Sequence, residues 1–204
     1  WNGAPPLHHA CTVGSGSVVE LLLGEKALQV DAADAGGSTA LMACALSGHA
    51  GTTEQLLRRR ADAGTLDHAG GTALMRACST GALRVAELLV AHRAPLDAQD
   101  ADGESAMHAA SYKGHAEVAQ LLLRHGADAA AANKAGHSAA DIAEALGHRE
   151  FAARLRDAER EAAPAAPAAP AAPAAPAAPA APLLPVDLSE AVASGGASGE
   201  AFGR

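Results

Sequence analysis

Hydrophobic residues recur along most of this chain in short segments with a helical period, and glycines separate the segments. One glycine ends each shorter apolar segment, at positions 14, 48, 81, 114 and 147, as is common at the C-terminus of a helix. A longer segment with its own apolar stripe then follows. In the five successive copies this stripe consists of Val18, Leu21 and Leu22; Leu56 and Leu57; Val85, Leu88 and Leu89; Val118, Leu121 and Leu122; and Phe151 and Leu155. The pattern predicts five pairs of short helices.

The five helix pairs share a fixed spacing. Residues 39–42 (TALM) are matched by 72–75 (TALM), 105–108 (SAMH) and 138–141 (SAAD), each 33 residues after the last, and by 5–8 (PPLH) 34 residues earlier. The leading Thr or Ser supplies an N-cap oxygen for the first helix of a pair. A period of this length is typical of repeat architectures, in which each unit packs on its neighbours. Five units therefore cover residues 1 to about 161.

The composition favours closely stacked helices. Hydrophobic residues make up 49% of the chain but aromatic residues only 2%, so Ala, Leu and Val must fill the core. Small side chains reach native packing density only through many close and regular contacts. Helices stacked at short distance provide such contacts more readily than a β-sandwich or a β-barrel does.

The motifs of these units resemble the ankyrin repeat. The first unit reads PPLHHA from residue 5, and the fourth reads SAMHAA from residue 105, then Gly114-His115 and VAQLLLRHGAD from residue 118. The family has a 33-residue period and a T-P-L-H-x-A signature. The resemblance implies an all-α ankyrin-repeat solenoid, built from stacked helix–turn–helix units with hairpin-like connecting loops. It also implies that the histidines of these motifs hold neighbouring repeats in register. These are His8, His49, His108, His115 and His148.

The spacing divides the chain into an ankyrin domain at 1–162 and a tail, with repeats at about 3–33, 34–66, 67–99, 100–132 and 133–161. The helix expected near 148–161 is long and polar, which suits a C-terminal cap. The N-terminal side has no comparable cap, so we expect further sequence upstream. Proline at every third position predicts a polyproline-II linker at 163–182. For 183–204 we favour a disordered tail over a short docking motif within 183–192.

Two features depart from the family pattern. The family has glycine after the second helix, where the backbone turns with positive φ, but only Gly126 matches, with Lys26, Arg60 and Arg93 at the equivalent places. If the arginines adopt this conformation, each costs about 1 kcal/mol relative to glycine. The second repeat also has small or polar residues in its second helix, and we expect it to be the weak point of the array. These residues are Gly51, Thr52 and Thr53.

We find no motif for catalysis, for a cofactor or for a metal, and we expect a protein that is not an enzyme. HExxH and CxxC motifs are absent from the sequence, and Cys11, Cys44 and Cys78 follow the repeat period. We interpret them as buried free thiols in a reducing compartment, which is the cytoplasm or, as the alternative, the nucleus. The net charge of −8 argues against a nucleic-acid partner. No apolar run approaches the roughly 20 residues that span a bilayer.

The predicted function is that of a monomeric, non-catalytic scaffold or adaptor that binds another protein. The alternative is a regulatory or targeting segment of a larger multidomain enzyme or channel. The resemblance implies a concave binding face, made of turn tips and the exposed side of the first helices. Matching the motif positions gives the candidate partner-binding residues, which are Leu46, Ser47, His68, Arg76, Ser79, Thr80, Asp102, Glu104, Tyr112, Lys113, Lys134 and His137.

Overall fold

A computed structural model describes residues 5–25 and 28–162, which form ten helices in five pairs. The linker and tail predicted at 163–204, and Lys26, lie outside the described residues. In chain order the helices are α1 (Pro6–Val13), α2 (Gly16–Leu23), α3 (Ala40–Ser47), α4 (Ala50–Arg58), α5 (Ala73–Thr80), α6 (Leu83–Ala91), α7 (Ala106–Ser111), α8 (Ala116–Arg124), α9 (Ala139–Ala145) and α10 (Arg149–Ala162).

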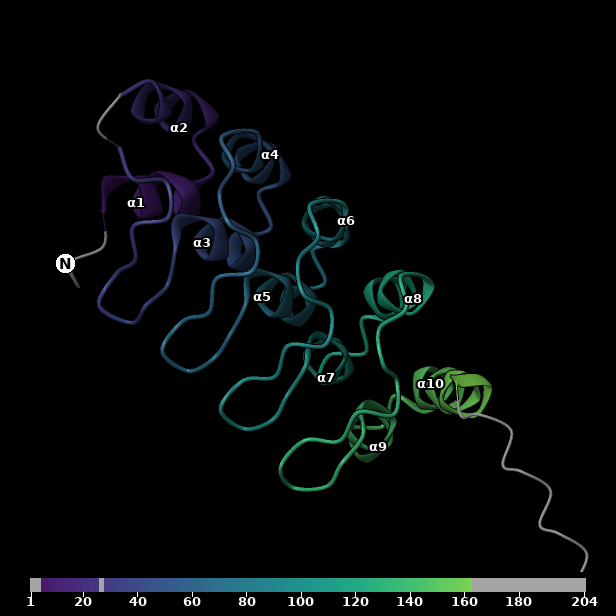
Figure 1. Cartoon of the computed structure of the whole chain (residues 1–204). Helices are drawn as coiled ribbons and strands as arrows, with labels where there is room; N and C mark the ends of the chain where they lie inside the picture. The colour runs from purple at the N-terminus through teal and green to yellow at the C-terminus, as the bar shows by residue number, and fades with distance from the viewer. Residues whose placement is uncertain (1–4, 26–27, 163–204) are drawn as a thin grey trace, which may run out of the picture. The chain divides into compact units, whose positions relative to one another are not determined.

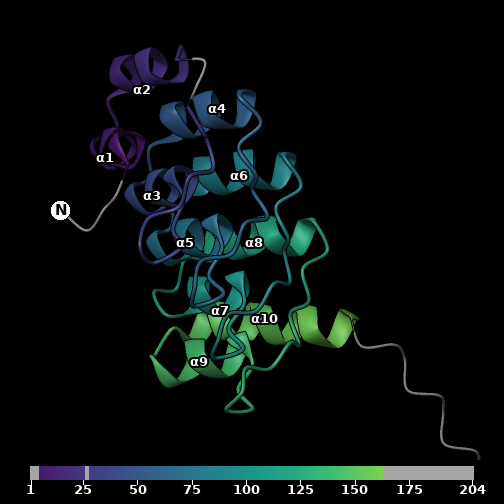
Figure 2. The same cartoon turned by 60° about the vertical axis from the view of Figure 1, so that its left-hand side comes forward.

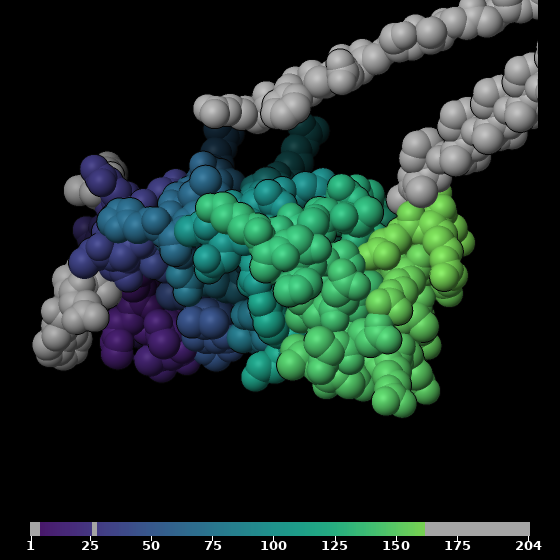
Figure 3. Space-filling model, turned by 90° about the horizontal axis from the view of Figure 1, so that it is seen from below, coloured from purple at the N-terminus to yellow at the C-terminus, as the bar shows by residue number. Residues whose placement is uncertain are grey.

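The helices lie in two layers, as predicted for an ankyrin array (Figure 1). One layer holds the first helix of each pair (α1, α3, α5, α7 and α9), and the other holds the second helices (Figure 2). Each first helix packs on its equivalent in the next repeat, and so do the second helices from α2 to α8. The loops that join successive repeats extend beyond the first-helix layer, and isolated antiparallel bridges close two of them, at Ala33–Thr39 and Ala132–Ser138. In the space-filling view the repeats follow one another in chain order (Figure 3).

The boundaries of the first helices follow from the residues predicted to set them. The hydroxyls of Thr39 and Thr72 accept hydrogen bonds from the backbone N–H groups of Met42 and Met75, at 3.4 and 3.1 Å. Ser138 caps α9 in the same way. The glycines at 14, 48, 81, 114 and 147 all have positive φ, which lets the chain turn into the second helix.

The second helices contribute a repeated set of leucines to the core. Leu56, Leu89, Leu122 and Leu155 occupy the same position in four repeats and are fully buried. The stripe predicted for the first repeat is wrong at two residues, because Val18 and Leu21 are exposed. Leu21 is exposed, whereas Leu88 and Leu121 at the equivalent position are half-buried and pack against the core. Val18 faces the side on which the described residues provide no preceding repeat.

The prediction about the turns after the second helices is confirmed for both arginines in the described part of the chain. Arg60 and Arg93 have φ values of 62° and 61°, and Gly126 at the same place has 86°. The polar side chains in the second helix of the second repeat find hydrogen-bond partners within the same repeat. Thr52 and Thr53 are buried, and their hydroxyls donate to the carbonyl oxygen of His49 at 3.0 and 2.9 Å.

Candidate functional site: the inner face of the array

The inner face consists of the loop tips at 34–38, 67–71, 100–104 and 133–137 and the exposed side of α1, α3, α5, α7 and α9. Each tip is closed by an acid or amide side chain whose oxygen accepts hydrogen bonds from two backbone N–H groups of the tip. These side chains are Asp34, Asp67, Asp100 and Asn133. In the first tip the N–H of Ser38 is the main cause that holds the pKa of Asp34 below its usual range. These bonds fix the shape of the tips without help from a ligand.

Backbone bonds also join one tip to the next. The N–H of His68 donates to the Gly36 oxygen at 3.0 Å, that of Ala101 to Ala69 at 2.7 Å, and that of Lys134 to Asp102 at 3.0 Å. Because successive tips are tied together, the inner face is preorganised, and preorganisation lowers the entropic cost of binding.

The motif histidines join neighbouring repeats, as the resemblance implied. His8 and His108 are buried, and their Nε2 atoms bond the carbonyl oxygens of Ser38 and His137 in the next tip, at 2.6 and 3.1 Å. The other three rings lie against the helix-ending glycine of the preceding repeat. The pairs are His49 on Gly14, His115 on Gly81 and His148 on Gly114.

The residues predicted on the first helices differ in their exposure. Leu46, Tyr112, Thr80 and Lys113 are exposed. Ser47 and Ser79 are half-buried, and the Ser79 and Thr80 hydroxyls donate to the backbone oxygen of Arg76 at 2.9 and 3.2 Å. Within this set, Leu46 and Tyr112 offer the most apolar surface.

Arg76 has an internal partner that the sequence did not indicate. Its Nη2 atom lies 2.6 Å from Oδ2 of Asp67, the residue that closes the tip of the same repeat. The Asp67 side chain is only 7% exposed and that of Arg76 30%. Removal of Arg76 therefore leaves a nearly buried carboxylate without its counter-ion, which is strongly destabilising. This makes Arg76 a structural residue as well as a candidate contact.

Tyr112 joins the first helix of the fourth repeat to its tip. Its hydroxyl donates to Oε1 of Glu104, and this bond is the largest cause that raises the pKa of Tyr112 to about 12. Burial and the carboxylates of Asp100 and Asp102 act in the same direction. The phenol is therefore neutral over the physiological pH range, and its ring is held in one orientation on the surface.

A hollow of about 260 Å³ lies beside Tyr112 and continues onto α9. Leu146, which the sequence analysis missed, is about half exposed here. The missed signal is its register, because Leu146 occupies in the fifth repeat the position of Ser47 and Lys113. The residues lining the hollow are Tyr112, His137, Asp141, Ile142, Ala145 and Leu146.

The predicted tip residues form the rim of the inner face. His68, Asp102, Lys134 and His137 are exposed, and Glu104 is half-buried. Lys134 is tied down, because its Nζ atom donates to the backbone oxygen of Ala101 at 2.6 Å. The rim therefore carries both signs of charge around an apolar and aromatic centre.

This arrangement matches a known protein family. The family described as ankyrin repeats (3 copies) matches residues 2–67, 44–133 and 74–162. The chain belongs to the ankyrin-repeat family. No curated protein matches it. Members of this family generally mediate protein–protein interaction and are typically non-catalytic.

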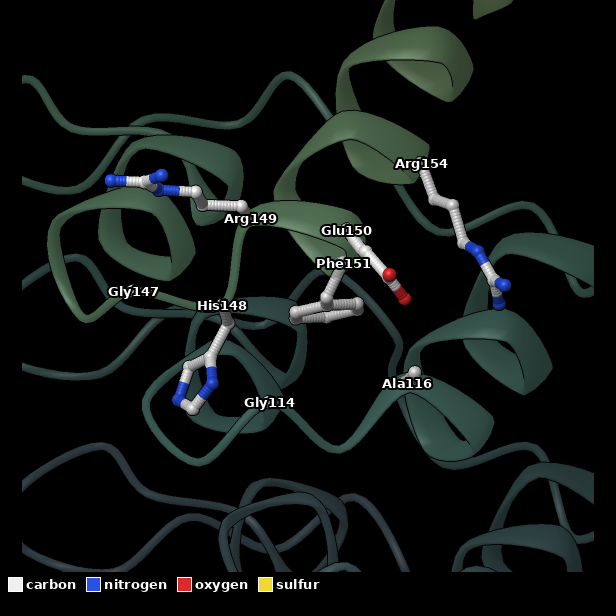
Figure 4. A pocket seen from close by; sticks show the side chains of 8 residues that line it. All are labelled: Gly114, Ala116, Gly147, His148, Arg149, Glu150, Phe151 and Arg154. Carbon is white, nitrogen blue, oxygen red and sulfur yellow. The ribbon is translucent and has the colours of Figure 1, made fainter.

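Some of the other hollows of the ankyrin array lie at the joints between repeats. One of about 390 Å³ lies between the fourth and fifth repeats, where His148 lies beside Gly114 and Phe151 is directed toward the start of α8 (Figure 4). Among residues 5–25 and 28–162, no group of three or more His, Cys, Asp or Glu side chains is placed to hold a metal ion. Within the same residues no helix is both long and apolar enough to cross a membrane.

Proposed function

We propose that this ankyrin array is a non-catalytic scaffold that binds a partner protein through its inner face. The observation that supports the proposal is the patch around Tyr112, where an oriented aromatic ring, a half-exposed Leu146 and a shallow hollow occur together. Aromatic residues in such positions carry a large share of binding energy at protein interfaces. Charged tip residues around the patch match the polar rim of a typical interface.

A second part of the proposal concerns the surroundings of the protein. Cys11, Cys44 and Cys78 are free and buried, and burial raises the pKa of the Cys78 thiol to about 12. Free thiols are typical of proteins in reducing compartments. We therefore propose that the chain works in the cytoplasm or nucleus.

The test is affinity capture from cell extract with the full chain and two matched variants. The first variant combines Tyr112→Ala with Leu146→Ser, on the inner face. The second, Leu21→Ser, removes an exposed leucine from α2, in the second-helix layer. Arg76 is left intact, because its loss would unpair Asp67 and confuse binding with stability.

The proposal predicts proteins that are captured by the parent and by Leu21→Ser and lost with the inner-face variant. For a purified partner, loss of an aromatic contact that carries about 2 kcal/mol weakens Kd roughly 30-fold. Equal melting temperatures of all three chains are the control. Capture that is equal for all three would show that the inner face is not the binding surface.

A further inference from the structure

The first repeat carries an apolar groove of about 580 Å³ on its outer side, which is the side that faces away from the second repeat. Two exposed valines line it, Val13 in α1 and Val18 in α2, which are 62% and 45% exposed. Within the described residues no helix covers this side. The remaining lining residues are Pro6, His9, Ala10, Ser15 and Leu22. Apolar surface concentrated in this way on one face marks an interaction site.

The residues at the equivalent positions of the later repeats are buried. Val18 corresponds to Thr52, Val85, Val118 and Phe151, all of which are buried. Leu22 is partly exposed, whereas its counterparts Leu56, Leu89, Leu122 and Leu155 are fully buried. The same two positions are therefore closed in four repeats and open in one.

The fifth repeat identifies the direction from which they are closed. It has a repeat before it but none after it among the described residues, and Phe151 and Leu155 are nevertheless buried. The first repeat has α3 and α4 after it and remains open. The helical hairpin that closes these positions is thus the preceding one, as α1 and α2 do for α3 and α4.

We propose that the outer face of α1 and α2 is a stacking surface for one more ankyrin-type helical hairpin, placed before α1. The occupant presents the face that this chain's own repeats turn toward their successors. That face has a small residue in the first helix and an aliphatic residue in the second. In this chain the pairs are Cys11 with Leu23, Ala45 with Leu57, Cys78 with Val90 and Ser111 with Leu123.

A second copy of this chain is the poorer occupant. The free end of the fifth repeat has Glu144 and Arg156 at these two positions, and the two side chains form an ion pair. Head-to-tail stacking would bury this pair against Val18 and Leu22, and the removal of two charges from water is strongly unfavourable. The groove therefore fits a hairpin with an apolar successor face and not the described end of the same array.

The test adds such a hairpin to the full chain. A copy of residues 72–100, which contains α5 and α6, is inserted before Trp1, so that the copied Thr72 lies 33 residues before Pro5. We expect the melting temperature to rise by about 5 °C or more. Amide exchange in α1 and α2 should slow by about 10-fold.

Two glutamate variants separate stacking from a general effect of the added chain. Val18→Glu, inside the groove, should remove most of the gain in melting temperature, while leaving the unextended chain little changed. Leu21→Glu, on the same helix but outside the groove, should leave the gain intact. These variants leave the inner face untouched, so a negative result here does not bear on the proposed function.

Three results would overturn the proposal. One is an extended chain with no gain in helical circular dichroism or in melting temperature. Another is an equal loss of the gain in both glutamate variants. The third concerns the unextended chain in sedimentation velocity. If it dimerises in the micromolar range and Val18→Glu abolishes the dimer, the occupant is a second copy.

Discussion

The two end repeats of the array share one helical pattern but present opposite surfaces. At the fifth repeat the side that would face a successor carries Glu144 and Arg156, where the earlier repeats have small and aliphatic residues. At the first repeat the side that would face a predecessor keeps Val18 and Leu22, as if it were an internal repeat. The fifth repeat thus presents a polar surface at its end of the array. The first repeat presents an apolar surface like those between repeats.

A third residue makes the difference clearer. In the first and fourth repeats His8 and His108 reach forward to bond the next tip. The fifth repeat has Asp141 at this position, with no following tip among the described residues, and its carboxylate lies 3.4 Å from Arg156. The bond to the next repeat is therefore replaced by an ion pair within the repeat. Surface pairs of this kind contribute little stability, so their value lies in keeping the end polar.

The largest expected effect comes from truncating the equivalent leucine at each end of the array. Leu155→Ala removes a fully buried side chain from α10, and a cost of about 3 kcal/mol in the free energy of unfolding is expected. Leu22→Ala removes a partly exposed one from α2, with an expected cost of about 1 kcal/mol. Urea unfolding followed by circular dichroism measures both. Equal costs would mean that the groove beside α2 is already filled in solution.

An effect of intermediate size is expected from changes in the middle of the array, which should raise its stability without altering either end. Arg60→Gly and Arg93→Gly replace residues with positive φ, and each is expected to add about 1 kcal/mol to the free energy of unfolding. His92→Gly is the matched control, because His92 has a φ of −95° and offers no strain to relieve. A fall in stability for both arginine variants would contradict the assignment of these turns.

The smallest expected effect is a pH dependence at the end formed by the fifth repeat. Hydrogen bonds with the N–H and then the hydroxyl of Ser138, followed by the interaction with Arg156, hold the pKa of Asp141 below its unfolded value of 3.8. A lowered carboxylate pKa stabilises the folded state above that value, and the contribution is lost as pH falls through the folded pKa. Compared with Asp141→Asn, the parent should be more stable by about 2 °C or less in Tm at pH 6. The difference should shrink as the pH falls below 3.8. A difference independent of pH would exclude this role for Asp141.

Much of the fold could be read from the sequence because each repeat sets its own boundaries locally. The Thr and Ser caps, the helix-ending glycines and the strained turns at Arg60 and Arg93 depend on residues close in the chain. The exposure of Val18 could not be read in this way. Its pattern is that of a buried residue, and burial depends on a neighbouring repeat that the described chain does not supply.

The candidate site was predicted less completely than the fold. Register alone placed Tyr112 and Leu46 on the inner face. It did not reveal the ion pair between Arg76 and Asp67, because that pair depends on how the loop tip folds back on the helix. Leu146 was missed because its repeat was interpreted only as a cap, although its position matches that of Lys113. A search of every repeat at each inner-face position would have found it.

Hydrogen exchange along the full chain compares the two ends of the array in one experiment. We expect α2, with its outer side open, to exchange at least about 10-fold faster than the part of α10 around Phe151 and Leu155. Among the internal second helices, α4 should be the least protected because of Gly51, Thr52 and Thr53. Protection of α2 equal to that of α10 would contradict the account, since it would mean that the two ends of the array are closed alike.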